Sequence, residues 1–239
     1  DRTLGTQMKA TGEVMAIDRS LEGSLLKAIR SLEIGLDHIE LKKIAHESME
    51  QLIERLHLVD DERIYVVAEA LRKGISVEKI HYITKIDKFF IEKIKNIITV
   101  EKALAENGLT EDVLRKAKRY SMTDSVIARY AHTTADEVQA KRKEWNIVPT
   151  YKYVDTCAAE FEAHTPYYYS AYATEDEVRP LGDKSVVVLG SGPIRIGQGV
   201  EFDYCSVQSS WALRKAGYKS IIINNNPETV STDFDTSDS

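Results

Sequence analysis

A glycine-rich segment near the end of the chain is the first place where the sequence suggests a binding site. The segment, Gly190-Ser-Gly-Pro-Ile-Arg-Ile-Gly-Gln-Gly199, lies between a short apolar run and a helical pattern. Glycines allow positive φ angles and a close approach of the backbone, and a helix N-terminus offers unpaired N–H groups to a phosphate. A nucleotide is therefore the first ligand to consider.

The segment departs from the common phosphate-binding fingerprints. Arg195 stands where a dinucleotide loop has its third glycine, and Asn224 ends the second apolar run where a ribose-binding acid is expected. No Gly-Lys-Ser or Gly-Lys-Thr follows, so the Walker pattern is also missing. The alternative to a nucleotide site is a tight turn that packs a helix against a strand.

Polar residues nevertheless follow both apolar runs, at the edge where open α/β sheets bind their ligands. We predict a loop motif there, with the two carboxylates Glu201 and Glu228 on the same loops. The motif consists of Gly190, Gly192, Arg195, Gln198 and Asn226.

The sequence gives little support for a metal site, a disulfide framework or a catalytic group. Cys157 and Cys205 lie too far apart in the sequence to suggest a zinc knuckle or a disulfide framework, and the six histidines lack ligand spacing. Asp233, Asp235 and Asp238 resemble metal ligands, but an acidic loop is more often simply solvated. We expect no catalytic residue, no metal site and no cofactor in this chain.

The glycine segment belongs to a predicted β-α-β unit. Residues 185–189 and 220–223 are apolar runs typical of buried parallel strands, and residues 202–216 have a helical pattern that closes at Gly217. Two strands and one helix cannot cover both faces of a sheet. We therefore expect a piece of a longer protein, cut inside a doubly wound domain.

The larger part of the chain, from about residue 20 to 145, shows helical periodicity throughout and predicts an all-α unit. Ser20 is a candidate N-cap, and Thr134 with Glu137 forms a candidate capping box. The expected helices are 21–32, 39–58, 61–73, 87–106, 111–120, 124–130 and 135–145.

Residues 149–180 join these two parts. They hold half of the 12 tyrosines, while Pro149, Pro166 and Pro180 discourage long helices. We predict a strap with little regular structure, laid against another domain. The alternative is an aromatic platform for bases or sugars.

Composition limits the class of protein. The chain has 239 residues, 43% of them hydrophobic and 29% charged, and a net charge of −6, which argues against a general affinity for nucleic acid. It has no run of the roughly 18 apolar residues that a membrane-spanning helix needs. We expect a cytoplasmic protein, because two thiols without a disulfide framework fit a reducing compartment.

The two ends of the chain carry a resemblance. The run VVVLGSGPIRIGQGVEFDYCSVQSSWALRKAGY, followed by NNNPETVSTDFDTSD, closely resembles the start of the second synthetase half of the carbamoyl phosphate synthetase large-subunit family. VPTYKYVDTCAAEF (148–161) is similar to the segment that enters that half, and GTQMKATGEVMAI (5–17) to the close of the first half.

The resemblance implies four parts. Residues 1–35 would end the first, carboxyphosphate-making half, and residues 36–148 would form a helical oligomerisation domain. The strap at 149–180 would connect this domain to residues 181–239. That last part would be the first β-α-β unit of a truncated Rossmann-like pre-ATP-grasp domain, so the fold class is α plus α/β.

The resemblance also implies an activity for the longer protein. It would make carbamoyl phosphate from bicarbonate, ammonia and two ATP, with Mg²⁺ or Mn²⁺, for pyrimidine and arginine biosynthesis. A glutaminase small subunit would supply the ammonia, and large subunits would self-associate. Carbamate would cross an enclosed passage, for which Glu13, Gly199, Glu201 and Glu228 match the family's lining. The isolated chain is expected to be inactive.

A rival interpretation is a stand-alone interaction module. Residues 121–145 imitate a helix-turn-helix with a basic run, Lys141-Arg-Lys143, and such a module would bind nucleic acid. Short helices joined by tight turns are also common in ordinary helical bundles.

Overall fold

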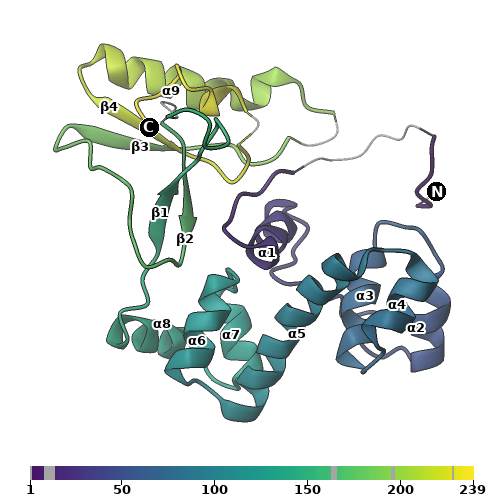
Figure 1. Cartoon of the computed structure of the whole chain (residues 1–239). Helices are drawn as coiled ribbons and strands as arrows, with labels where there is room; N and C mark the ends of the chain where they lie inside the picture. Colours follow the sequence, from purple (N-terminus) through teal and green to yellow (C-terminus); the bar gives the residue numbers. More distant parts are fainter. Residues whose placement is uncertain (1, 8–13, 163–165, 195–196, 228) are drawn as a thin grey trace. The chain divides into compact units, whose positions relative to one another are not determined.

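The computed structural model describes residues 2–7, 14–162, 166–194, 197–227 and 229–239 (Figure 1). It divides into two compact units. The first is built mainly from residues 34–147, together with residues 20–30. The second is built mainly from residues 148–239, together with residues 14–19 and 31–33.

The described part of the first unit is helical, apart from turns and a single bridge between Thr3 and Asp60. Its helices are α1 (Leu21–Ser31), α2 (Met49–Leu56), α3 (Arg63–Arg72), α4 (Val77–Thr84), α5 (Lys88–Asn107), α6 (Glu111–Arg119), α7 (Asp124–Tyr130) and α8 (Ala135–Glu144).

Local signals placed most of these helices correctly. Ser20 Oγ accepts the N–H of Gly23 at 3.0 Å, as expected of a cap residue. The expected box at α8 forms differently, because Thr134 Oγ1 accepts the N–H of Glu137 while the Glu137 carboxylate accepts the hydroxyl of Thr133. The cap of α8 is therefore Thr134 alone.

The expected helix at 39–58 is wrong in its first half. Residues 42–46 form turns, and α2 begins only after Ser48, whose hydroxyl and backbone N–H make a capping box with Gln51. Ile39 and Ile44 are nevertheless buried, so the apolar spacing reflects contacts with the core rather than a helix. Helix α4 was not expected at all, although Ser76 caps it.

Helix α5 is the central element of this unit. It contacts α3, α4, α6 and α7, and its buried face includes Ile91, Ile94, Ile97, Ile98 and Leu104. Asp87 caps its start, and Gly108 with a φ of 65° ends it, within a residue or two of the expected helix at 87–106. Phe90, which has the spacing of a core residue, is 48% exposed, whereas Ile91 beside it is fully buried.

In the second unit, the predicted strap contains regular structure after all. Strand β1 (Thr150–Tyr153) pairs with β2 (Tyr168–Ala171) in an antiparallel register that places Tyr153 opposite Tyr168. Their rings meet edge to face at 5.3 Å between centroids. Cross-strand aromatic pairs stabilise such ladders, which explains why a segment rich in tyrosine forms strands.

The predicted β-α-β order is present at the end of the chain. Strand β3 (Ser185–Leu189) pairs in parallel with β4 (Lys219–Ile223), and between them come the 3₁₀ turn η1 (Val200–Asp203) and helix α9 (Tyr204–Lys215). Another 3₁₀ turn, η2 (Val230–Thr232), follows β4. Helix α9 contacts both strands, and Ser210 on α9 donates to Ser220 on β4 at 2.8 Å.

The two strands are less buried than expected. Side chains alternate between the two faces along a strand, so the residues on either side of Ser220 point away from α9. On that other face Val187, Leu189 and Ile223 are 49%, 76% and 52% exposed. A single helix covers one face and leaves the other open. The expected mixture of α and β structure is confirmed, with the qualification that β3 and β4 form an open two-stranded sheet.

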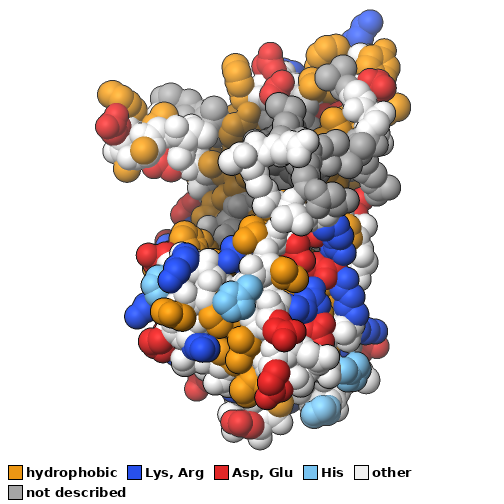
Figure 2. All heavy atoms as spheres, turned by 90° about the vertical axis from the view of Figure 1, so that its right-hand side faces the viewer, with side chains coloured by type: hydrophobic (Ala, Val, Ile, Leu, Met, Phe, Trp, Pro, Cys, Tyr) orange, Lys and Arg blue, Asp and Glu red, His pale blue; other side chains and the backbone are white. Residues whose placement is uncertain are grey.

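Figure 2 shows acidic and basic side chains intermingled with hydrophobic ones over the helices. Within the described residues, no helix is both long enough and apolar enough to cross a membrane.

Candidate functional site

The glycine loop after β3 lies beside the loop after β4. The N–H of Gly190 donates to the carbonyl oxygen of Ile223 at 2.8 Å and so extends the parallel pairing by one residue. The N–H of Gly192 donates to Asn224 Oδ1 at 3.1 Å, and Gly192 has a φ of 77°, a conformation that favours glycine. The two loops are therefore joined by hydrogen bonds from the glycine backbone.

The Asn224 side chain fills the space over the glycine turn. Besides Gly192, its Oδ1 accepts the N–H of Asn226 at 3.3 Å, and its Nδ2 donates to Thr229 Oγ1 at 3.2 Å. A Cβ built on Gly190 would lie 2.5 Å from Asn224 Cγ. The glycine at position 190 thus makes room for a side chain of the same chain. Because the N–H groups of residues 190 and 192 already have acceptors, this turn does not fit a phosphate in the form described.

A buried carboxylate supports the second loop. Asp203 is fully buried, and its Oδ2 accepts the N–H of Ser231, which is also fully buried. Its Oδ1 has no hydrogen-bond partner among the described residues. Sequence reasoning missed Asp203, Thr229 and Ser231. Thr229 and Ser231 lie in the polar stretch that begins after the apolar run 220–223, and that stretch was the available signal for them.

The structure brings together only some of the residues predicted for the site. Gly190, Gly192 and Asn226 are brought together around Asn224, and Asn226 is 3% exposed. Gln198 and Glu201 are exposed, and a Cβ on Gly199 would clash with the Glu201 carboxylate. The other predicted site residues, Glu13, Arg195 and Glu228, lie outside the described residues.

The acidic residues near the end of the chain have structural contacts. Asp238 Oδ2 accepts the N–H of Ser220 at 2.9 Å and lies 3.9 Å from Arg214 Nε. No group of three or more His, Cys, Asp or Glu residues in the described ranges is arranged to hold a metal ion. Cys157 and Cys205 are free thiols.

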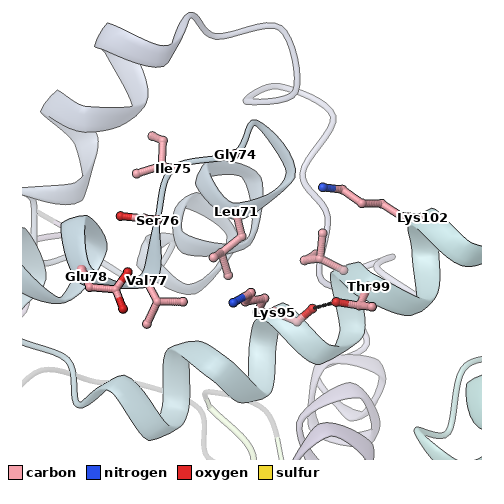
Figure 3. A pocket seen from close by; sticks show the side chains of 10 residues that line it. Leu71, Gly74, Ile75, Ser76, Val77, Glu78, Lys95, Thr99 and Lys102 are labelled. Atoms are coloured by element: carbon pink, nitrogen blue, oxygen red, sulfur yellow. Dashed lines mark hydrogen bonds between the residues drawn. The ribbon is translucent and has the colours of Figure 1, made fainter.

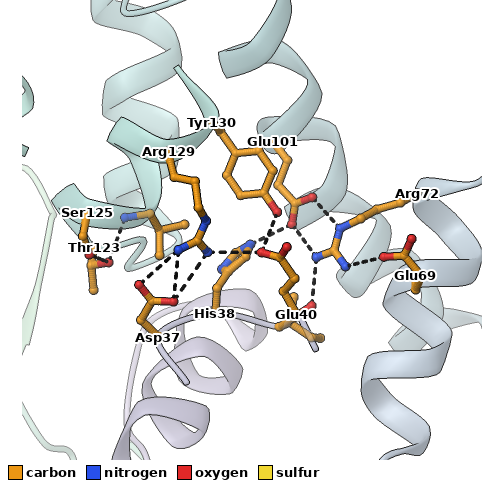
Figure 4. Close-up of polar contacts among 12 residues, drawn as sticks. Asp37, His38, Glu40, Glu69, Arg72, Glu101, Thr123, Ser125, Arg129 and Tyr130 are labelled. Atoms are coloured by element: carbon orange, nitrogen blue, oxygen red, sulfur yellow. Dashed lines mark hydrogen bonds and ion pairs between the residues drawn. The ribbon is translucent and has the colours of Figure 1, made fainter. Parts of the chain in front are cut away.

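A buried ionic cluster joins several elements of the helical unit (Figure 4). Arg72 on α3 donates to both oxygens of Glu101 on α5, at 2.8 and 2.9 Å, and to the carbonyl oxygen of Ile39 at 2.8 Å. His38 Nε2 donates to Glu101 Oε1 at 2.7 Å. His38 and Glu101 are 1% and 3% exposed, so their interaction is little weakened by water.

The environment of this cluster shifts the pKa values of Glu101 and of Tyr130, whose ring packs edge to face against His38. Burial alone would raise the pKa of Glu101, but hydrogen bonds from Arg72 and His38 outweigh burial and lower it to about 2. Burial raises the pKa of the Tyr130 phenol well above its usual range. At neutral pH Glu101 is therefore ionised, and the cluster links elements without presenting a reactive group to solvent.

The basic run on α8 is largely compensated within the chain. Arg142 is bound to Asp124 by hydrogen bonds of 2.7–3.0 Å, and Lys141 pairs with Glu144 at 2.9 Å. Nucleic-acid binding depends on cations that are available to phosphates. The helix-turn-helix interpretation stays a prediction, and these ion pairs do not support it.

A small pocket of about 240 Å³ lies between α3, the start of α4 and α5 (Figure 3). Its volume is below the range of about 300–1,000 Å³ typical of small-molecule sites. The hydroxyls of Ser76 and Thr99 on its wall are already bonded to the backbone, at Lys79 and Lys95. Glu78, Lys95 and Lys102 also line the pocket, but its small volume and its occupied hydroxyls do not favour a ligand site.

Comparison with known proteins relates the chain to one family. A family model described as "Carbamoyl-phosphate synthetase large chain, oligomerisation domain" matches residues 13–146, and "Carbamoyl phosphate synthase preATP-grasp domain" matches residues 182–239. The carbamoyl phosphate synthase large chains of Thermoanaerobacter sp. (strain X514) and Caldanaerobacter subterraneus subsp. tengcongensis are 55% and 54% identical over 238 residues. Each match covers 100% of this chain and 22% of the relative.

Proposed function

Because the chain belongs to the carbamoyl-phosphate synthetase large-chain family, we propose that it forms the central part of a large chain that makes carbamoyl phosphate. The substrates of that protein would be bicarbonate, ammonia released from glutamine, and two ATP. The product would serve pyrimidine and arginine biosynthesis. Any activity belongs to the longer protein, since this chain spans 22% of the length of its relatives.

One observation carries this proposal. The two family models match in order along one chain, and the 55% identity extends over 238 residues, through the region between them. A stand-alone helical module would not require the α/β segment that follows.

In the proposed arrangement the helical unit is a self-association domain. The second unit contributes the start of a Rossmann-like pre-ATP-grasp domain. This interpretation is supported by the parallel pairing of β3 with β4 and by the contacts of α9 with both strands. The boundaries would be those of the sequence analysis: 1–35, 36–148, 149–180 and 181–239.

ATP and its Mg²⁺ or Mn²⁺ would bind to other parts of the longer protein. The side chain of Asn224 occupies the glycine turn, and the described residues contain no metal-binding group of acids, histidines or cysteines. A glutaminase small subunit would be the second partner. A cytoplasmic location stays a prediction, based on the two free thiols.

In this proposal, Gly199 and Glu201 are the described residues that line the carbamate passage. Glu201 is exposed, and its carboxylate packs directly against Gly199, where any side chain would have to displace it. Such carboxylates could hold water or exchange protons with neutral carbamic acid, whereas they would repel the carbamate anion. Glu13 and Glu228 would complete the lining.

The test uses the full-length protein with Gly199→Leu and, separately, Glu201→Lys. We expect bicarbonate-dependent ATP hydrolysis to continue, while carbamoyl phosphate formed per ATP falls severalfold, because carbamate is lost before it reaches the second active site. The measurement is the ratio of carbamoyl phosphate to ADP, with the exposed Glu160→Lys as the control. A normal ratio in both variants would exclude the passage role.

Full-length protein that forms no carbamoyl phosphate from glutamine, bicarbonate and ATP would overturn the proposed activity itself.

A further inference from the structure

The turn that carries Gly199 and Glu201 ends in a buried carboxylate. Turn η1 (Val200–Asp203) follows directly on Gly199, and the N–H of Phe202 within it donates to the carbonyl oxygen of Gly199 at 3.2 Å. Glu201 is exposed in this turn, whereas Asp203 at its end is fully buried. A single turn therefore joins the two residues assigned to the passage to a group inside the second unit.

The carboxylate of Asp203 fastens this turn to the loop after β4. Its Oδ2 accepts the N–H of Ser231 in turn η2, and Ser231 is also fully buried. The two 3₁₀ turns are in contact. Water does not reach either partner, so removing the carboxylate would leave the N–H of Ser231 without an acceptor. The hydrogen bond thus holds η1 against η2.

Turn η2 is in turn bound firmly to the rest of the second unit. The N–H of Thr229 donates to Thr232 Oγ1 at 3.2 Å, and Thr236 Oγ1 donates to the carbonyl oxygen of Val230 at 3.0 Å. Ser210 on α9 donates to the carbonyl oxygen of Thr236 at 2.8 Å. A turn that is anchored to η2 therefore takes its position from the body of the unit.

The second oxygen of Asp203 shows that stability alone does not explain this residue. Oδ1 is buried and has no hydrogen-bond partner in the described part of the chain. A buried polar atom without a partner costs stability, because it gives up hydrogen bonds to water and gains none. A residue that only filled this space would be better apolar, so the contact made by Oδ2 is the feature that calls for an acid here.

The position of the η1 turn also determines how its two exposed residues meet. A Cβ built on Gly199 would lie 2.4 Å from Glu201 Oε2, so the carboxylate packs against the glycine backbone. A shift of the turn would displace both residues together. Misplacing a functional group by about 1 Å can change a rate by roughly 100-fold, so a passage wall has to be held precisely.

We propose that Asp203 is a positioning residue of the carbamate passage, which holds the η1 turn in place through its hydrogen bond to Ser231. The inference rests on the proposed function and adds to it a residue that does not touch carbamate. What matters in Asp203 is the acceptor oxygen that meets the N–H of Ser231. An amide oxygen at the same place can make the same contact.

The experiment compares Asp203→Ala with Asp203→Asn in the full-length protein. We expect Asp203→Ala to lower the carbamoyl phosphate formed per ADP severalfold while bicarbonate-dependent ATP hydrolysis continues. Asp203→Asn should restore most of this ratio, because its amide oxygen still accepts the N–H of Ser231. Thermal unfolding verifies that each variant is folded. If Asp203→Ala is not, Asp203→Leu replaces it, with a branched side chain that fills the space but accepts no hydrogen bond.

Ser210→Ala is the matched control. Ser210 is also fully buried, and the substitution removes hydrogen bonds to Ser220 and Thr236 while leaving the contact between Asp203 and Ser231 in place. We expect this variant to unfold at a lower temperature and to keep the original ratio. A fall as large as that of Asp203→Ala would show that any loss of stability uncouples the reactions, and would overturn the positioning role.

The other outcomes separate this inference from the proposed function. A normal ratio in the folded variant that lacks the acceptor, or an Asp203→Asn variant that is equally uncoupled, would overturn the role of Asp203. If Gly199→Leu and Glu201→Lys uncouple the reactions in the same series, the passage itself stands. If those two variants also keep a normal ratio, the passage role fails and the inference fails with it.

Discussion

At the scale of single residues, Glu101 shows how a charge is accommodated inside the helical unit. It is 3% exposed and accepts hydrogen bonds from Arg72 and His38, which come from a helix and from a loop far from it in the sequence. A buried ion pair of this kind adds little over a well-packed apolar core, but removing one member leaves the other charge without compensation. The cluster therefore makes the unit sensitive to single substitutions.

We expect Glu101→Gln to lower the free energy of unfolding of the chain by up to about 3–5 kcal/mol at pH 7, because the buried Arg72 would lose the carboxylate that binds it through two hydrogen bonds and keep only Glu69, at 3.2 Å, as a counter-charge. The measurement is urea denaturation followed by circular dichroism. Glu92→Gln is the control: Glu92 is on the same helix, is half exposed, and pairs with Lys95 at 3.4 Å. An exposed pair contributes about 0–1 kcal/mol, so the control should be nearly neutral.

The same variant has a definite pH dependence. The pKa of Glu101 is lowered from 4.5 to about 2 in the folded chain, so its ionised form stabilises the fold above pH 4.5. That contribution is lost as the pH falls from about 4.5 to 2. The stability difference between the original chain and Glu101→Gln should shrink over this window, and a difference that stays constant would contradict the assignment.

At the scale of elements, the loops after β3 and β4 act as one structure because of Asn224. Its amide group joins Gly192, Asn226 and Thr229. The glycines were predictable from the sequence as the residues of a tight turn, and so was the carboxyl edge of the strands as their position. That the turn holds an asparagine side chain became visible only when both loops were placed in space.

Gly190→Ala should lower the free energy of unfolding by about 1–3 kcal/mol, the typical effect of overpacking, because the new methyl group would overlap Asn224. Thermal unfolding of the chain measures this effect. Gly5→Ala serves as the control, since a Cβ there meets nothing within 4 Å. In a chain that already carries Asn224→Gly, Gly190→Ala should be nearly neutral, because the side chain that the new methyl group would overlap is gone. Strictly additive effects of the two substitutions would argue against the overlap.

At the scale of the whole molecule, the open face of the β3–β4 sheet is a consequence of having one covering helix. Leu189 and Ile223 are paired in register and lie next to each other on that face, both more than half exposed. Exposed apolar sheet surface of this kind attracts other apolar groups.

Leu189→Lys should therefore reduce the binding of an environment-sensitive apolar dye, while the free energy of unfolding changes by no more than about 0.5 kcal/mol, as at other exposed positions. Dye fluorescence and urea denaturation report the two effects. Leu58→Lys, at a 55% exposed leucine of the helical unit, is the control and should leave most of the dye signal. Equal losses of signal in both variants would show that the sheet face is not the dye site.

Local information determined much of this protein. Side-chain caps and helix-ending glycines act over a few residues, so the helices at 88–107, 111–119, 124–130 and 135–144 and the strands at 185–189 and 219–223 were predicted within one or two residues. The family was also recognisable from the sequence, because the two end motifs are long.

Contacts between distant residues decided the rest, because their free energy depends on which partner is present in space. Residues 42–46 form turns despite the helical spacing of this segment, since Ile39 and Ile44 reach the core from a loop. The tyrosine segment forms a hairpin because Tyr153 meets Tyr168 across two strands. His38, Arg72 and Glu101 gave no signal as a group, because no spacing rule relates a loop to two helices that only folding brings together.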